Sequence, residues 1–264
     1  MSLRINSNVE AFNAHRNLIG SAGKLAKSME RLSSGYRINR AADDAAGLAI
    51  SERLRGQVRG LAQAQRNAQD AVSLVQTAEG SLTEVHAMLQ RVRELAVQYK
   101  NGSLSTNDRT SIQSEVNQLA SEIERIGQSA QFNGTKLLDA TTTVSFQVGA
   151  NDGEVIGVST QAMSSIVGTI SLGTSTTLSS IDGFIGAVSD QRAAFGAVQN
   201  RLQYTLDNLA TYQENLTSSL SRIRDVDMAS EMVDFTKLQI LQQAGTAMLA
   251  QANQAPQSVL SLLR

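Results

Sequence analysis

The residues that can do catalytic or metal-binding chemistry are few and scattered. The two histidines, His15 and His86, stand far apart, and no metal-ligand spacing surrounds either of them. The sequence has no cysteine, so disulfides and thiolate nucleophiles are excluded. Asp43 and Asp44 are neighbours, but adjacent residues do not share a helix face, and acids suit the start of the helix expected at "RAADDAAGLAIS". No phosphate-binding glycine loop or nucleophile elbow occurs. We expect no enzyme activity and no cofactor.

Composition bounds the class of protein. The net charge is −1, so no overall basic field favours nucleic acid. Residues 1–60 carry twice as many basic as acidic side chains, which we interpret as solvated helix faces. No stretch is apolar enough to span a bilayer, and the polar N-terminal stretch lacks the apolar core of a secretory signal. A single proline, Pro256, leaves room for very long helices.

A heptad pattern dominates the first half of the chain. Steps of four and three from Ile50 meet one polar residue, Gln57, and otherwise apolar or aromatic side chains, which predicts a supercoiled helix seam. The positions are Ile50, Leu54, Gln57, Leu61, Ala64, Ala68, Ala71, Val75, Ala78, Leu82, Val85, Leu89, Val92, Ala96 and Tyr99.

Two further helical patterns and one strand pattern follow. Ser105 and Asp108 resemble a capping box that opens a second helix. Its seam is Ile112, Val116, Leu119, Ile123 and Ile126. The third seam is Val188, Gln191, Phe195, Val198, Leu202, Thr205, Leu209, Tyr212, Leu216, Ser219 and Ile223. The predicted helices cover about 45–100, 105–128 and 180–222. Alternating apolar residues around the turn sequence "GANDGE" predict a β-hairpin over about 140–160.

Both ends of the chain are apolar on more than one helical face. The N-terminal seam is Leu18, Ala22, Leu25, Met29 and Leu32, and a second stripe holds Ile5, Val9, Phe12, Ile19 and Ala26. From Leu238 to Leu263 there is no Lys, Arg, Asp, Glu or His. The seam predicted there is Leu238, Leu241, Gly245, Met248, Ala252, Ala255, Val259 and Leu262, with Leu249 among the apolar residues off it. We expect the two ends to pair. The predicted fold is mainly α: a long antiparallel coiled-coil-like helical bundle rod with a small β-hairpin region, plus paired N- and C-terminal helices.

Pairing of the two ends does not cover all of this apolar surface. Full burial of a large apolar side chain stabilises by about 1.5–3 kcal/mol, whereas ordering each residue costs about 1.5 kcal/mol. A single partner helix buries only part of the C-terminal segment. We therefore expect this segment to be loose in a monomer and buried between many copies in an assembly.

Long stretches of the sequence resemble bacterial flagellin. The likeness is carried by "RLSSGYRINRAADDAAGLAISERLRGQVRGLAQAQRNAQDAVSLVQTAEG", "LQRVRELAVQYKNG", "QFNGTKLLD" and the C-terminal "QILQQAGTAMLAQANQAPQSVLSLLR". It covers roughly residues 1–140 and 185–264. Many flagellins carry large outer domains between these regions, and this chain has only a short connection there.

The resemblance implies a domain organisation and a function. Residues 1–44 and 223–264 would form the two halves of an inner polymerisation domain around a central channel, and residues 45–222 an outer rod domain. The chain would be a secreted subunit of the extracellular filament used for swimming. It would leave the cell through the flagellar type III apparatus and meet cap and junction proteins at the growing end. The expected polymerisation residues are Ile5, Val9, Phe12, Leu18, Leu25, Met29, Leu32, Leu238, Leu241, Met248, Leu249, Val259 and Leu262.

Two further partners are implied by the resemblance. An export chaperone would cover the loose C-terminal segment before assembly, and we place its contacts on Leu238, Leu241, Met248 and Leu249. Flagellins of this pattern are ligands of Toll-like receptor 5. The matching positions are Gln90, Arg91, Leu95 and Glu115, with Arg91 as the expected anchor.

Alternatives from the same and from other classes stay open at this stage. A hook-filament junction protein has similar end helices, although the continuous match over 89–139 favours flagellin. A signalling coiled-coil rod would require a membrane span or a partner-binding hairpin tip, and the sequence offers neither.

Overall fold

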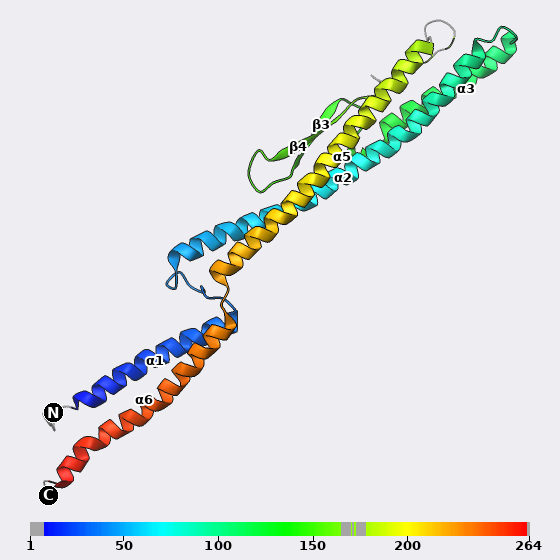
Figure 1. Cartoon of the computed structure of the whole chain (residues 1–264). Coiled ribbons are helices and arrows are strands. Elements are labelled where there is room, and N and C mark those ends of the chain that lie inside the picture. The colour runs from blue at the N-terminus through cyan, green and yellow to red at the C-terminus, as the bar shows by residue number, and fades with distance from the viewer. Residues whose placement is uncertain (1–7, 165–169, 171, 173–177, 263–264) are drawn as a thin grey trace. The chain divides into compact units, whose positions relative to one another are not determined.

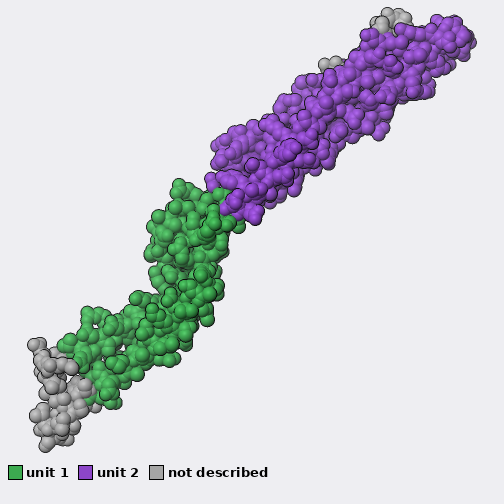
Figure 2. Space-filling view, in the orientation of Figure 1, with its two compact units in different colours: residues 1–56, 216–264 green, residues 57–215 purple. Residues whose placement is uncertain are grey.

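The computed structural model describes residues 8–164, 170, 172 and 178–262, with side chains described as far as Gln254 in the last helix. The chain is mainly helical, as predicted (Figure 1). It divides into two compact units, one formed by residues 1–56 and 216–264 and the other by residues 57–215 (Figure 2). The predicted division into inner and outer domains at 44/45 and 222/223 stays a prediction, because it concerns roles rather than packing.

The unit of residues 57–215 is built on three long helices. These are α2 (Ala45–Tyr99), α3 (Thr106–Ser129) and α5 (Leu178–Arg224), and their bounds lie within two residues of those predicted. The capping box at the start of α3 is confirmed: the Ser105 hydroxyl accepts from the Asp108 backbone N–H, and the Asp108 carboxylate accepts from the Ser105 N–H. The Ser105 hydroxyl also donates to the Asp108 carboxylate at 2.8 Å. This hydrogen bond first, and then the one from the Ser105 N–H, lowers the pKa of Asp108.

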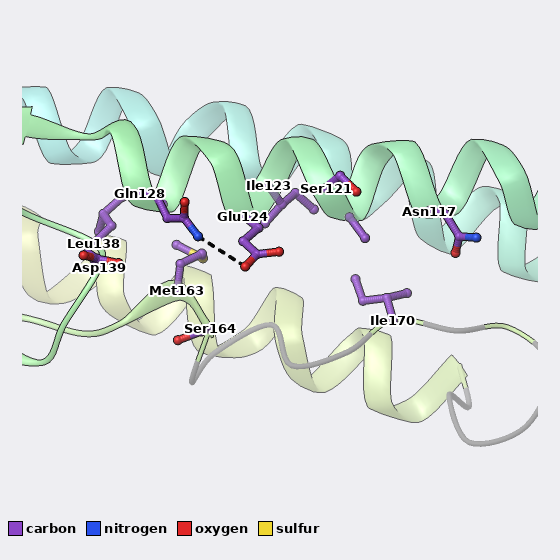
Figure 3. A pocket seen from close by; sticks show the side chains of 12 residues that line it. Asn117, Ser121, Ile123, Glu124, Gln128, Leu138, Asp139, Met163, Ser164 and Ile170 are labelled. Carbon is purple, nitrogen blue, oxygen red and sulfur yellow. Dashed lines mark hydrogen bonds between the residues drawn. The ribbon is translucent and has the colours of Figure 1, made fainter.

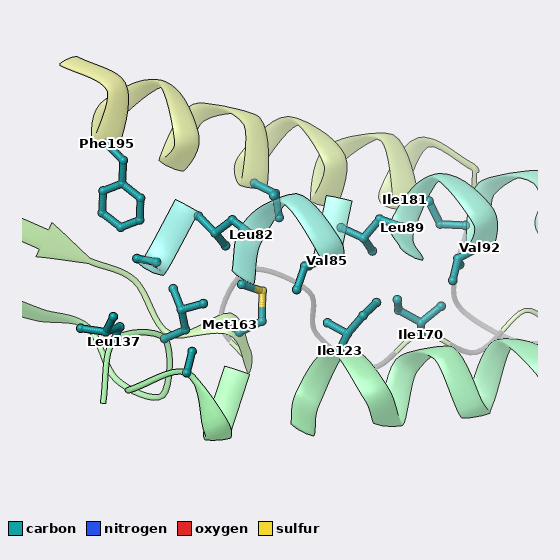
Figure 4. Packing of buried hydrophobic residues seen from close by; sticks show 14 of the residues in the cluster. Leu82, Val85, Leu89, Val92, Ile123, Leu137, Met163, Ile170, Ile181 and Phe195 are labelled. Atoms are coloured by element: carbon teal, nitrogen blue, oxygen red, sulfur yellow. The ribbon is translucent and has the colours of Figure 1, made fainter. Parts of the chain in front are cut away.

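The core of this unit follows the predicted seams, except that Tyr212 of the α5 seam is 44% exposed. Every seam position of α2 from Leu61 to Ala96 is buried. From Val75 on, these residues cluster with residues of α3 and α5, whereas Ala68 and Ala71 cluster with Leu202 of α5 and with Val148 and Ile156. Figure 4 shows Leu82, Val85 and Leu89 of α2 between Phe195 of α5 and Ile123 of α3. The pattern is wrong at its N-terminal end, since Ile50 is 42% exposed.

A β-hairpin, predicted over 140–160, packs on this helical core. Strands β3 (Thr142–Gln147) and β4 (Val155–Thr160) pair antiparallel, and Ile156, Val158 and Thr160 are buried while their neighbours on β4 are exposed. The buried Gln191 of α5 donates to the Ser159 carbonyl oxygen at 3.0 Å. This hydrogen bond explains why a glutamine occupies an otherwise apolar seam, since a buried amide must find a partner.

A second, smaller hairpin was not predicted. Strands β1 (Gln131–Phe132) and β2 (Thr135–Lys136) pair around Asn133 and Gly134, whose φ angles are 48° and 80°. Two successive residues with positive φ are typical of the tight turn that Asn-Gly favours. The Asn-Gly dipeptide was therefore a usable signal, but the flanking strands are too short to show a period of two.

The other unit pairs the two terminal helices. Helix α1 (Val9–Ser34) lies antiparallel to α6 (Met228–Leu262). At one end the Asn8 side-chain amide donates to the Ala252 carbonyl oxygen at 2.7 Å, and at the other Arg31 pairs with Glu231 at 3.6 Å. The expected pairing of the chain's two ends is therefore confirmed. In the described part of the chain, no helix is long and apolar enough to cross a bilayer.

We predict that the unit of residues 57–215 depends on its central aromatic residue. Phe195→Ala removes a ring that is 1% exposed, so the free energy of unfolding should fall by about 3–5 kcal/mol. Tyr204→Ala on the same helix is the matched control. Tyr204 is 77% exposed, and its loss should change stability by no more than about 0.5 kcal/mol. Urea unfolding followed by circular dichroism measures both, and similar losses would contradict this account of the core.

Candidate assembly interface

The seam between α1 and α6 is regular on both helices. On α1 the buried or half-buried positions that advance by three and four are Ala11, Ala14, Leu18, Ser21, Leu25, Ser28 and Leu32. On α6 they are Glu231, Phe235, Leu238, Gln242, Gly245, Leu249 and Ala252. Large and small residues alternate along α1, which allows the helices to interdigitate in the manner of a coiled coil.

The register of α6 differs from the one predicted. Leu238, Gly245 and Ala252 face α1 as expected, but Leu241 and Met248 are 46% and 64% exposed. Gln242 and Leu249 take their places in the seam. A helical segment with no charge and with apolar residues on several faces, as α6 is beyond Lys237, offers more than one register, and spacing alone does not choose between them. The terminal contacts at Asn8 and Arg31, and the close approach of Leu18 to Gly245, favour the observed one.

Gly245 packs against Leu18 in the α1–α6 seam. A Cβ atom placed on Gly245 would lie 3.1 Å from Cδ1 of Leu18. Because that distance is shorter than ordinary van der Waals contact, an alanine here would require the Leu18 side chain to shift by a few tenths of an ångström. Glycine therefore has a packing role here that compensates for its cost inside a helix.

Beside this seam, both helices expose apolar side chains to solvent. Of the sixteen large hydrophobic residues exposed in the described part of the chain, four lie on α1 and six on α6. They are Val9, Phe12, Ile19, Met29, Met228, Met232, Val233, Ile240, Leu241 and Met248. Phe12 is 70% exposed and Val233 is 69% exposed. Clustered exposure of this kind marks an interaction surface rather than a solvated face.

The predicted polymerisation residues fall into two groups in the structure. Leu18, Leu25, Leu32, Leu238 and Leu249 are half-buried in the α1–α6 seam, whereas Val9, Phe12, Met29, Leu241 and Met248 point outward. Ile5 lies outside the described residues, as do the side chains of Val259 and Leu262. Sequence reasoning missed Met228, Met232 and Val233, which precede the uncharged segment. The only signal available for them was their spacing, since Met232 and Val233 follow Met228 by four and five residues.

The connection between α1 and α2 is held by Asp43. Its carboxylate accepts from the Lys27 ammonium at 2.7 Å and from the backbone N–H groups of Arg40 and Asn39. These hydrogen bonds, the one from Lys27 first, lower the pKa of Asp43 to about 2. Asp44 instead caps α2 by accepting from the Gly47 N–H at 2.8 Å. The helix expected to start here is confirmed, and the two carboxylates serve structure rather than chemistry.

The segment that follows α1 is hydrogen-bonded to the segment that joins α5 to α6. The Arg37 N–H donates to the Arg224 carbonyl oxygen at 2.7 Å, and the Val226 N–H donates to the Gly35 carbonyl oxygen at 3.0 Å. The Arg224 guanidinium lies 4.5 Å from the centre of the Tyr36 ring and pairs with Glu52 at 3.0 Å. These contacts join the C-terminal end of α1 to the segment just before the N-terminal end of α6.

The predicted receptor residues lie on α2 and α3 in the other unit. The Arg91 guanidinium donates to Glu115 at 3.0 and 3.1 Å and to Glu94 at 3.1 Å. The Arg91 and Glu115 side chains are about half exposed, and that of Glu94 is 69% exposed. Its partners, Glu115 first, raise the pKa of Arg91. Gln90 is exposed and within 2.9 Å of His86 Nε2.

Leu95 does not belong to this surface. It is 2% exposed and packs in the core with the other apolar residues of α2. Its placement among the receptor contacts is corrected here, because a side chain inside the helical bundle cannot be touched from outside.

One cavity lies against α3. It has a volume of about 590 Å³ and is lined by α3 residues such as Asn117 and Ile123, together with Leu138 and Met163 (Figure 3). Glu124 and Gln128 are hydrogen-bonded to each other at its wall. Among the described residues, no group of three or more His, Cys, Asp or Glu side chains is placed to hold a metal ion. The geometry offers no reacting set around the cavity.

Comparison with known proteins agrees with the sequence and the geometry. The model of the bacterial flagellin N-terminal helical region matches residues 5–143, and that of the C-terminal helical region matches residues 178–263. The chain is 53% identical to a flagellin of Halalkalibacterium halodurans, over 98% of this chain and 99% of that protein. It is 47% identical to a flagellin of Bacillus subtilis, over 99% of this chain and 100% of that protein.

A third relative is named for the filament itself. The chain is 49% identical to the flagellar filament 33 kDa core protein of Treponema phagedenis, over 98% of this chain and 99% of that protein. Nothing in these comparisons favours a hook-filament junction protein. This chain therefore belongs to the bacterial flagellin family, the structural, non-enzymatic subunits of the flagellar filament.

Proposed function

We propose that copies of this chain polymerise into the flagellar filament through the outward faces of α1 and α6. The observation that carries the proposal is the apolar surface on these two helices, which their mutual pairing leaves exposed. Each large side chain covered by a neighbouring copy would contribute about 1.5–3 kcal/mol before the costs of association. Near-absence of charge on α6 beyond Lys237 means that such burial desolvates few ions.

The two groups of polymerisation residues would act differently. Outward residues such as Phe12 and Leu241 would touch a neighbouring copy directly. Seam residues such as Leu18 and Leu249 would act by holding α1 and α6 in one register, so that their outward faces form a single surface.

We predict that one charge on the outward face of α1 blocks assembly. Phe12→Asp places a carboxylate where the polymer would bury it, so filaments should not form from the purified chain. Asn17→Asp, which adds the same charge at another exposed position of α1, should still give filaments. Negative-stain electron microscopy after seeding scores both, beside a truncation after Leu238 as the reference for complete loss. Filaments of normal length from Phe12→Asp would refute the proposed surface.

Family resemblance supports a route to the filament. The chain would be exported through the flagellar type III apparatus without cleavage and added at the distal end beneath a cap protein, so that it resides outside the cell. Before export, a chaperone would cover the apolar surface of α6 through Leu238, Leu241, Met248 and Leu249. Leu241 and Met248 are exposed and ready for such contact, while Leu238 and Leu249 become available only if α6 leaves α1.

The chaperone proposal predicts unequal effects on the two faces of α6. Leu241→Asp and Met248→Asp together should abolish retention of the chaperone in a pull-down, because both side chains are exposed. Gln243→Asp, at an exposed polar position of the same helix, should retain it. Undiminished retention by the double variant would remove these residues from the contact.

We also propose that the monomer is a ligand of Toll-like receptor 5 through Gln90, Arg91 and Glu115. Support comes from the family resemblance and from the exposed ion-paired cluster of Arg91, Glu94 and Glu115. Arg91 is already aligned by two carboxylates across α2 and α3, so little side-chain entropy is lost when it meets a partner. The same surface would be covered by a neighbouring copy in the filament, so monomers would signal and filaments would not.

Arg91→Ala is therefore expected to reduce receptor signalling by the monomer by about tenfold or more. Arg93→Ala is the matched control, since Arg93 is on the same helix but pairs with Asp182 of α5 at 2.6 Å. A cell reporter assay over a range of monomer concentrations measures both variants. Equal potency of Arg91→Ala and the unmodified chain would count against the proposed contact.

A further inference from the structure

Four methionines stand exposed on the terminal helices. The exposed fractions are 56% for Met29 on α1, and 48%, 49% and 64% for Met228, Met232 and Met248 on α6. Methionine is usually a core residue, because its flexible thioether fills irregular apolar gaps. Four thioethers open to solvent on one pair of helices are therefore unusual.

Elsewhere in the described chain, methionine is protected. Met163 is 2% exposed, and Met88 is partly buried against the core of the unit of residues 57–215. Met1 lies outside the described residues. Exposure thus separates the methionines by location, with the accessible sulfurs on the helices that carry the proposed polymerisation surface.

Three of the four gather at one end of the helix pair. The Arg31–Glu231 ion pair fixes the level at which α1 and α6 meet there, and it brings Met29 to the level of Met232. Met228 lies one turn away on α6. Met248 is placed toward the other end, between the Leu18–Gly245 approach and the Asn8–Ala252 hydrogen bond. Both ends of the outward surface therefore hold at least one thioether.

We propose that Met29, Met228, Met232 and Met248 are oxidation sites whose conversion to the sulfoxide keeps the chain unassembled. This inference rests on the proposed function, because it requires the outward faces of α1 and α6 to be buried in the polymer. Assembly then protects the same sulfurs, so the unassembled chain is the sensitive form and the filament is the resistant one.

The chemistry requires a peroxide as co-reactant. The thioether sulfur attacks one peroxide oxygen, an S–O bond forms and the O–O bond breaks. Sulfur is oxidised by two electrons, and the peroxide is reduced to water. The product is a polar, chiral side chain in place of a flexible apolar one, and a thiol-dependent methionine sulfoxide reductase reverses the change.

The sulfoxide oxygen is a strong hydrogen-bond acceptor. In the exposed monomer, water satisfies it, so the α1–α6 pair tolerates the change. In an apolar contact between copies, the same oxygen would be buried. For Met248, the stretch of α6 beyond Lys237 offers no charged donor to receive it. Burying one unpartnered polar group weakens an association by about tenfold, and a repeating contact is affected in every copy.

The test begins with the full-length monomer treated with hydrogen peroxide. Peptide mass mapping, which does not depend on polymerisation, should show gains of about 16 Da at Met29, Met228, Met232 and Met248 before Met88 and Met163 react. After removal of peroxide, the critical concentration for seeded polymerisation should rise by about tenfold or more. Incubation with a methionine sulfoxide reductase and a thiol should restore both the mass and the polymerisation.

Variants assign the effect to these residues. Polymerisation of each variant is scored as the ratio of treated to untreated protein, so every variant supplies its own baseline. The combination Met29→Leu, Met228→Leu, Met232→Leu and Met248→Leu should give a ratio near one. The control combination Met88→Leu and Met163→Leu should stay as sensitive as the unmodified chain.

Each outcome decides between the two proposals. Full polymerisation of the sulfoxide form overturns the inference, as does equal sensitivity of the four-leucine variant or oxidation of Met163 as fast as Met248. Failure of the reductase to restore polymerisation also overturns it. By contrast, a complete absence of filaments in the untreated arm counts against the proposed polymerisation function itself.

Discussion

The constraint on which the rest of the structure depends is that two helices in contact cover only one face of each other. Helices α1 and α6 carry apolar residues on more than one face, so their pairing leaves a surface that no other part of the described chain covers. By contrast, α2 is packed against α3, α5 and the β3–β4 hairpin, and its seam is buried within one chain from Leu61 to Ala96. One unit can thus be complete as a monomer, while the other is satisfied only in an assembly.

This difference also explains what the sequence could predict. The α2 seam was predicted residue by residue from Leu61 to Ala96, because charged and polar residues on its other faces leave a single apolar stripe. On α6 beyond Lys237 the absence of charge made several registers equivalent, and Leu241 and Leu249 were placed on the wrong sides. Contacts between distant residues, such as Leu18 with Gly245, settled the register, and a linear pattern does not contain such pairs.

The candidate surfaces show the same limit. Gln90, Arg91 and Glu115 lie outside the predicted seams and are exposed, as the helical period required. Leu95 was included because it matched a motif, but it lies on the stripe that widens the α2 seam and is buried. In the β1–β2 hairpin a real signal was not used. The Asn133-Gly134 dipeptide is typical of a tight turn, but the two strands that it joins are too short to be recognised from their sequence.

The lack of charge on α6 beyond Lys237 has a consequence for degradation. A protease that cuts after lysine or arginine finds Lys237 at the start of the apolar segment and no further site before Arg264. Such an enzyme removes the segment as one piece or leaves it intact, and no series of partly shortened tails can accumulate. A copy cut after Lys237 therefore loses the whole uncharged segment in one step.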